Sequence, residues 1–235
     1  MLRELMSILR STDPIAEIAE DFGDMIGLAR DLTFRAGRIL FDEAPDPDTE
    51  RREVSKQDIA INKLERSIRR RIVTHLTLAT NTRDAAYCLL LMSVVKDMER
   101  IGDYAKNLAE VRHDGGAPVP ADELGNELRD LRAVVEGMLA DAREVFTSSQ
   151  SQKAAEIITV GRSVNRRCDT LISQVTRSGH DAATTTSLVL GARYSKRSVS
   201  HLLNLLSGIV MPLHKLDYFD EDELDSIRGE EEEEE

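Results

Sequence analysis

The sequence predicts an all-α protein made of two three-helix bundles in tandem, and three observations support this fold class. Tryptophan is absent and aromatic residues make up only 4% of the chain, while Ala, Leu, Arg and Glu are abundant, as is typical of helices. Apolar residues recur at three- and four-residue steps through six long segments. Proline and glycine cluster in the breaks between these segments. With 235 residues, 41% of them hydrophobic, the chain can bury a substantial core.

The first helix is expected over residues 14–41. Asp13 can accept hydrogen bonds from the free amide groups at its start, and Pro14 suits the first helical position. Two prolines within residues 42–48 prevent its continuation. A short amphipathic stretch, residues 1–10, precedes this helix.

The second helix is expected over residues 49–78 and the third over residues 84–111. The connection between them is so short that the two helices must form an antiparallel hairpin. The Gly- and Pro-containing stretch at residues 113–120 is the strongest break in the chain. The first half is therefore predicted to be one three-helix bundle.

The same order of elements returns after the break, with helices expected over residues 121–146, 150–177 and 181–213. We accordingly assign the chain to four parts, which are the first bundle (1–113), a linker (114–120), the second bundle (121–216) and a C-terminal tail (217–235). The tail holds twelve acidic residues and one arginine, a net −11 of the chain's −12, so the remainder is near neutral. With so few apolar residues, this acidic tail is expected to be disordered.

Several classes of protein are excluded or disfavoured by the sequence. No run of 18 apolar residues and no targeting segment occurs, so we expect a cytoplasmic protein. Cys88 and Cys168 are isolated within helical patterns and are expected to fill the core. No nucleophile–base pattern or phosphate-binding glycine loop is present, and basic stretches lack interleaved aromatic residues, which argues against an enzyme and against nucleic-acid binding.

A candidate cation site lies in the predicted second and third helices. Glu99 and Asp103 are four residues apart, so a helix places both on one face, and Asp58 and Asn62 have the same spacing on the preceding helix. Carboxylate and amide oxygens of this kind suit iron, manganese, magnesium or calcium rather than zinc or copper. The alternative is an ordinary solvated face on which Glu99 pairs with a neighbouring base such as Arg100.

The segment of residues 97–110 resembles the signature helix of the PhoU family, and residues 58–65 resemble the helix that precedes it in that family. The resemblance covers residues 14–113 and extends, less closely, to about residue 213. It implies paired three-helix bundles and a metal ion bound through the acidic motif, with iron the first choice and manganese or magnesium the alternatives.

The family resemblance also implies a function. It points to a non-enzymatic regulator of inorganic phosphate transport and phosphate-starvation signalling. Such a protein acts through contact with a phosphate transporter and its sensor histidine kinase, and meets the membrane only through these partners. The long amphipathic helices also make a homodimer plausible.

The two halves can be aligned as repeats, and the alignment changes the charge of the candidate site. Lys196 falls at the position of Glu99 and Ser200 at that of Asp103, while Arg162 and Arg166 fall opposite Asp58 and Asn62. The second half is therefore predicted to have lost its cation ligands.

The basic residues of the second half suggest a different ligand. Guanidinium groups match phosphate oxygens in a forked geometry, so a possible anion site is formed by Arg162, Arg166, Lys196 and Arg197. The alternative is that these side chains pair with acids elsewhere in the fold.

Two other functions remain open from the sequence. One is a divergent helical scaffold or adaptor that binds no metal, in which the acidic motif survives for packing. The other is a carboxylate-bridged metalloenzyme, which is disfavoured because such sites use Glu-x-x-His pairs that are missing here. Gly102, in the middle of the motif, is expected to allow close helix packing.

Overall fold

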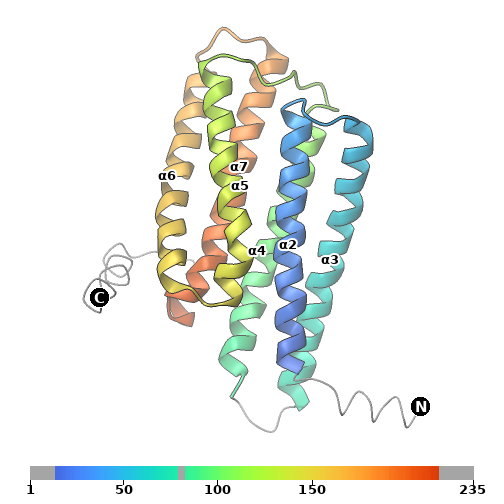
Figure 1. The fold of residues 1–235 in the computed structure, drawn as a ribbon, viewed down its shortest axis with the longest axis vertical. Helices are drawn as coiled ribbons and strands as arrows, with labels where there is room; N and C mark the ends of the chain where they lie inside the picture. The colour runs from blue at the N-terminus through green and yellow to red at the C-terminus, as the bar shows by residue number, and fades with distance from the viewer. Residues whose placement is uncertain (1–13, 79–82, 217–235) are drawn as a thin grey trace.

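The computed structural model describes residues 14–78 and 83–216, and it confirms the predicted all-α fold of two tandem three-helix bundles (Figure 1). The expectations for residues 1–10 and for the acidic tail at 217–235 fall outside the described residues. Within the described ranges, the six long helices are Pro14–Leu40 (α2), Pro47–Leu78 (α3), Ala85–Glu110 (α4), Glu123–Thr147 (α5), Ser151–Val175 (α6) and Ala182–Val210 (α7), followed by the short 3₁₀ helix Leu213–Lys215 (η1).

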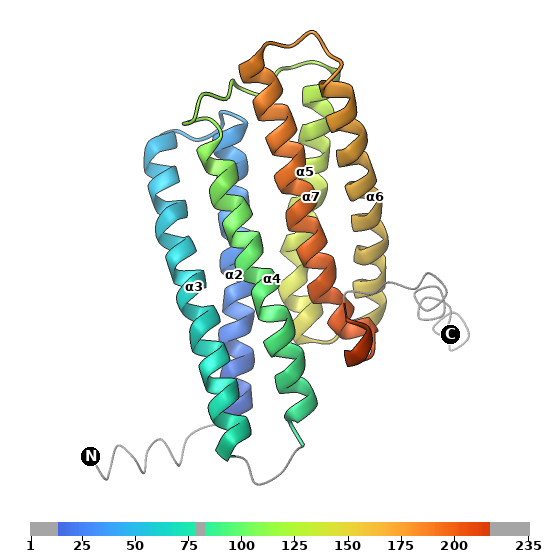
Figure 2. The same cartoon turned by 180° about the vertical axis from the view of Figure 1, so that it is seen from behind.

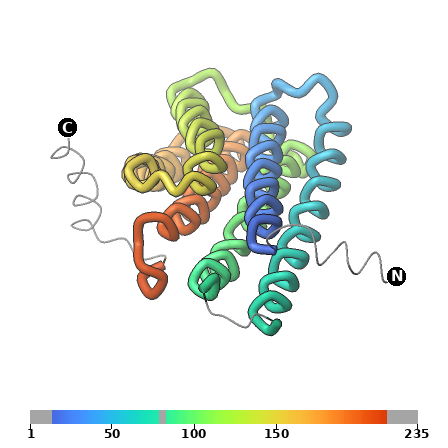
Figure 3. The backbone as a smooth tube through the Cα atoms, turned by 60° about the horizontal axis from the view of Figure 1, so that its bottom comes forward, coloured from blue at the N-terminus to red at the C-terminus, as the bar shows by residue number. Residues whose placement is uncertain are grey.

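The two bundles lie side by side along their length. Helices α2, α3 and α4 form the first bundle and α5, α6 and α7 the second, as the view from below shows (Figure 3). Helices α4 and α7 run antiparallel next to each other at the centre, and α3 and α6 occupy the outer sides (Figure 2). Contacts between α4 and α7, supplemented by contacts between α2 and α5, join the bundles.

Most helix ends lie within one to three residues of the sequence expectation, and two of the differences have a clear local cause. Helix α3 begins at Pro47, earlier than expected, because Asp46 accepts a hydrogen bond of 3.1 Å from the backbone N–H of Thr49 and proline is tolerated in the first turn. Helix α7 ends at Val210 because Met211 adopts an extended conformation ahead of Pro212.

One continuous hydrophobic core runs through both bundles. Each helix contributes a buried stripe, and the rings of Phe22 in α2 and Phe146 in α5 pack with centroids 5.1 Å apart across the boundary between the bundles. Cys88 and Cys168 are both buried in this core with free thiols, as expected. Across the described ranges, no helix combines the length and apolar character that crossing a bilayer requires.

Candidate cation site and the contact between the bundles

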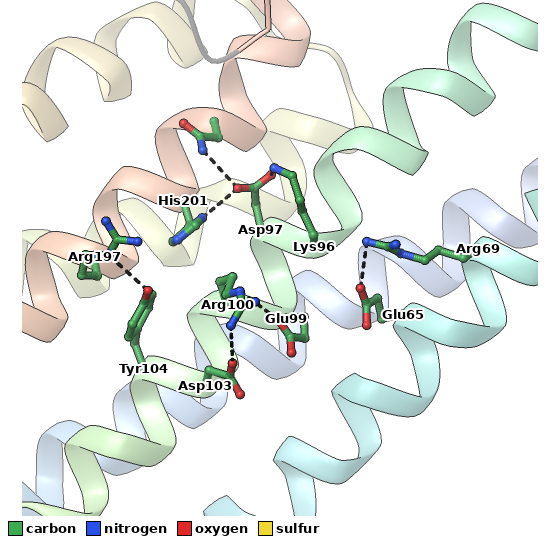
Figure 4. A network of polar contacts seen from close by, with 11 residues as sticks. Glu65, Arg69, Lys96, Asp97, Glu99, Arg100, Asp103, Tyr104, Arg197 and His201 are labelled. Atoms are coloured by element: carbon green, nitrogen blue, oxygen red, sulfur yellow. Dashed lines mark hydrogen bonds and ion pairs between the residues drawn. The ribbon is translucent and has the colours of Figure 1, made fainter.

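Glu99 is at the centre of an acidic face shared by α3 and α4 (Figure 4). Its pKa is raised above the usual glutamate value, first because the carboxylate is partly buried and then because Asp103 lies on the same face of α4. Glu65 and Asp58, both on α3, raise the pKa of Glu99 further. The structure therefore brings four carboxylates into one electrostatic environment.

Arg100 partly neutralises the acids of α4. Its Nη1 donates to Asp103 Oδ2 at 3.2 Å, and its Nε lies 3.6 Å from Glu99 Oε2. The arginine side chain is 55% exposed, so it can turn into solvent at little cost. The alternative foreseen from the sequence, in which Glu99 pairs with a neighbouring base, is the arrangement that this structure contains.

The acids of α3 also have basic neighbours. Asp58 is buried, and Lys106 Nζ donates to its Oδ2 at 3.4 Å. Arg69 Nη2 lies 3.0 Å from Glu65 Oε1. Asn62 is half-buried between Asp58 and Glu65 on the same helix, and its backbone carbonyl accepts a hydrogen bond from an arginine one turn later. Glu65 had not been proposed as a ligand, although it lies in the same sequence stretch two helical turns after Asp58.

The chemistry of this donor set fits a hard cation, while the present geometry does not enclose one. Carboxylate oxygens from two adjacent helices are the ligands that iron, manganese and magnesium accept. Among residues 14–78 and 83–216, however, no three His, Cys, Asp or Glu side chains are close enough together to hold an ion. Binding at Glu99 and Asp103 would require Arg100 to leave the acids it now contacts.

The four basic residues considered for an anion site have different neighbours. Lys196 Nζ donates to both carboxylate oxygens of Asp169, at 2.7 and 2.6 Å. Arg197 points to the other bundle, Arg166 lines an open groove between α5 and α6, and Arg162 is half-buried on α6. Lys196 and Arg197 therefore contact different groups, and Arg166 lies on the side of α6 that faces α5.

A buried polar network at the contact between the bundles was not identified from the sequence. Asp97 of α4 is completely buried, and its Oδ1 lies 2.7 Å from Nδ1 of His201 and accepts from Nδ2 of Asn204 at 3.1 Å. Lys96 Nζ donates to the other carboxylate oxygen at 3.0 Å. Burial alone would raise the pKa of Asp97, but these hydrogen bonds outweigh it, and the pKa is lowered.

An aromatic cluster extends the contact between α4 and α7, about two helical turns after Asp97. The ring of Tyr104 stacks on that of Tyr194, with centroids 6.1 Å apart, and lies 5.7 Å from the ring of His201. Arg197 Nε donates to the Tyr104 hydroxyl at 3.1 Å (Figure 4). The helix that presents Glu99 and Asp103 to α3 thus presents Asp97 and Tyr104 to α7.

Comparison with known proteins identifies the domain that contains this face. Residues 22–111 match the PhoU domain family. The whole fold is similar to the crystal structure of PhoU from Pseudomonas aeruginosa, with a TM-score of 0.75 and 20% identity over 86% of this chain and 97% of that one. It is also similar to the phosphate transport system regulatory protein PhoU from Streptococcus pneumoniae, with a TM-score of 0.71 and 19% identity over 88% of this chain and 100% of that one. A comparison with curated proteins finds no match.

Proposed function

We propose that this chain, whose residues 22–111 form a PhoU domain, regulates inorganic phosphate transport and phosphate-starvation signalling. The observation that carries the proposal is the acidic helix at residues 97–110. It lies inside the matched domain, and α4 presents Glu99 and Asp103 from it to α3. The fold shared over most of the chain with two PhoU proteins, one of them described as a phosphate transport system regulatory protein, adds support.

The proposed regulator works in the cytoplasm by contact rather than by catalysis. Its partners are a phosphate transporter and the sensor histidine kinase linked to it. Support for a contact surface comes from the α3–α4 hairpin, where Val73, Leu78 and Leu89 are 55%, 75% and 50% exposed. Large apolar side chains exposed at one end of a hairpin are typical of a surface that another protein covers.

The cation belongs to the proposal as a ligand of the first bundle. Glu99 and Asp103 would hold it, with Asp58 and Asn62 of α3 supplying further oxygens, and iron is the first candidate ahead of manganese and magnesium. When bound, it would supply positive charge beside Glu99, whose pKa is raised by burial and by the neighbouring acids. Metal analysis of the purified protein and of the Glu99→Gln/Asp103→Asn variant, after exposure to each metal and desalting, tests this part. Metal retained equally by both proteins would place it elsewhere.

A metal-free helical adaptor is the second candidate, and the ion pairs of Arg100 with both acids favour it. Negligible metal in the wild-type protein would favour the metal-free adaptor over the metal-binding regulator. The regulatory role would then still need a separate test.

The regulatory role itself is tested by deletion of the gene in its host. We expect the deletion strain to express a phosphate-starvation reporter even when phosphate is plentiful, and a plasmid copy of the wild-type gene to restore repression. Unchanged reporter expression and unchanged phosphate uptake in the deletion strain would overturn the proposed function.

A further inference from the structure

Lys196 occupies in the second bundle the place that Glu99 occupies in the first. Glu99 of α4 faces Glu65 of α3, whose charge raises its pKa, and Lys196 of α7 faces Asp169 of α6, whose carboxylate it contacts through both oxygens. The same pair of positions therefore holds two acids in one bundle and an ammonium–carboxylate pair in the other.

Contacts between the bundles support this correspondence independently. Adding 97 to a residue number in α4 gives its counterpart in α7, so Asp97 corresponds to Tyr194 and Tyr104 to His201. Under this rule the contact between Asp97 and His201 maps onto the contact between Tyr194 and Tyr104, and the structure contains both. The same rule relates Glu99 to Lys196, so the two bundles are related by an approximate twofold axis between α4 and α7.

The two acid-bearing faces differ in how their charge is balanced. In the first bundle, the side chain of Arg100 is 55% exposed and lies 3.6 Å from the carboxylate of Glu99 and 3.2 Å from that of Asp103. In the second bundle, Lys196 is 25% exposed and lies 2.6 and 2.7 Å from the two oxygens of Asp169. Asp169 is 57% exposed, so its pair with Lys196 lies at the surface of the second bundle, but the short contacts to both carboxylate oxygens hold the ammonium where a cation would otherwise bind.

We propose that Lys196 is a built-in counterion that makes the second bundle independent of metal cations, so that only the first of the two bundles responds to a cation. The ammonium neutralises the charge of Asp169 and repels a divalent ion from the same position. In the alignment of the two halves, Arg162 and Arg166 of α6 stand where Asp58 and Asn62 stand on α3, so α6 supplies no oxygen ligand from these two positions.

Lys196 is thus the residue that excludes cations from the second bundle. The conclusion that only the first bundle responds to a cation rests on the proposed function, because it assumes that Glu99 and Asp103 bind one. The exclusion of cations by Lys196 can be tested without that site.

The test uses the full-length chain in a Glu99→Gln/Asp103→Asn background, which removes the proposed ligands of α4, so that an added response to metal can be assigned to the substitution made in the second bundle. Thermal unfolding is followed with and without millimolar Mn²⁺. Lys196→Glu is compared with Lys196→Met, which removes the ammonium without adding an acid. We expect the background itself to show no Mn²⁺ response and both variants to melt at lower temperature without metal.

Only the Lys196→Glu protein should then regain stability when Mn²⁺ is added, with a rise in Tm of at least about 2 °C for a chain of this size. A background that responds to Mn²⁺, a Lys196→Glu variant that does not, or a Lys196→Met variant that responds equally would each overturn the proposal. Circular dichroism verifies that each variant is folded. If Lys196→Glu does not fold, the double variant Asp169→Asn/Lys196→Glu replaces it, because it removes the repulsion between the two acids. Comparison of the wild type with the background variant separately reports whether the first bundle binds the metal.

Discussion

The carboxylate of Asp97 in α4 lies 2.7 Å from the imidazole Nδ1 of His201 in α7, and this pair joins the two bundles at a position where Asp97 is completely buried. Asn204 and Lys96 complete its hydrogen bonds. Because an ion buried at an interface is stable only while its partners remain, this network fixes how the acidic helix sits against the second bundle.

We predict that Asp97→Asn destabilises the protein by about 1–3 kcal/mol, because the charged acceptor of three hydrogen bonds is replaced by a neutral amide. The pKa of Asp97 is lowered in the folded state, so its stabilising contribution is present above the ordinary aspartate pKa of about 4 and is lost as the pH falls through the lowered value. Urea unfolding at pH 7 and at pH 3 measures this.

The difference in unfolding free energy between wild type and Asp97→Asn should be large at pH 7 and shrink at pH 3. Lys96→Met is the matched control, since Lys96 is half exposed and its removal should cost no more than about 1 kcal/mol. Equal stability of wild type and Asp97→Asn at pH 7 would contradict the role assigned to the buried network.

Glu99→Gln should have the opposite effect and stabilise the metal-free protein at neutral pH. Because the pKa of Glu99 is raised in the folded state, its charged form is penalised, and this penalty grows as the pH rises through that value. Thermal unfolding without metal should give a higher Tm for the variant at pH 7 and similar values for both proteins near pH 4.

Glu53→Gln is the control for the predicted rise in Tm, because it neutralises a glutamate whose pKa is shifted in the opposite direction. The pKa of Glu53 is lowered, first by the hydrogen bond from Lys56, so neutralising this acid should not stabilise the protein. If Glu99→Gln behaves like Glu53→Gln, the acidic face does not carry the repulsion described here.

Substitution of Gly102 tests how closely α3 and α4 pack. A Cβ at this position would meet Cδ1 of Ile61 at 3.0 Å, whereas a Cβ at Gly137, in the middle of α5, would meet no atom within 4 Å. We predict that Gly137→Ala stabilises by about 1 kcal/mol through helix propensity. Gly102→Val should destabilise by about 1–3 kcal/mol because the added methyl groups overpack the contact. Chemical denaturation would contradict this account if Gly102→Val were neutral.

The thiols should be inert in the folded protein. Burial raises the pKa of Cys168 to about 12, and it also raises that of Cys88, so neither forms the reactive thiolate at neutral pH. A thiol reagent should label them only at the rate of unfolding, with full labelling in denaturant. Rapid labelling of the native protein would show that the core opens around one of them.

The fold could be predicted because its signals are local. Apolar periodicity defines the helices, and breaks such as the one around Pro45 and Pro47 place their ends within a few residues. The shared face of Glu99 and Asp103 follows from helical spacing for the same reason.

The remaining features of the site depend on residues distant in the chain. Burial of Asp97 requires His201, which lies on a helix of the other bundle, and the orientation of Arg197 requires Tyr104. Lys196 pairs with Asp169 instead of being left to bind an external anion, and this depends on how α6 and α7 are rotated against each other. Spacing within one helix contains no information about such contacts.

The central claim is that the acidic face of the first bundle is needed for phosphate regulation, and phosphate uptake in the complemented deletion strain tests it most directly. Wild-type protein and the Glu99→Gln/Asp103→Asn variant are expressed at equal levels, with Lys196→Met as a variant that alters the second bundle only. We predict that wild type and Lys196→Met restore normal uptake in plentiful phosphate and that the double variant does not. Full restoration by the double variant would contradict the account.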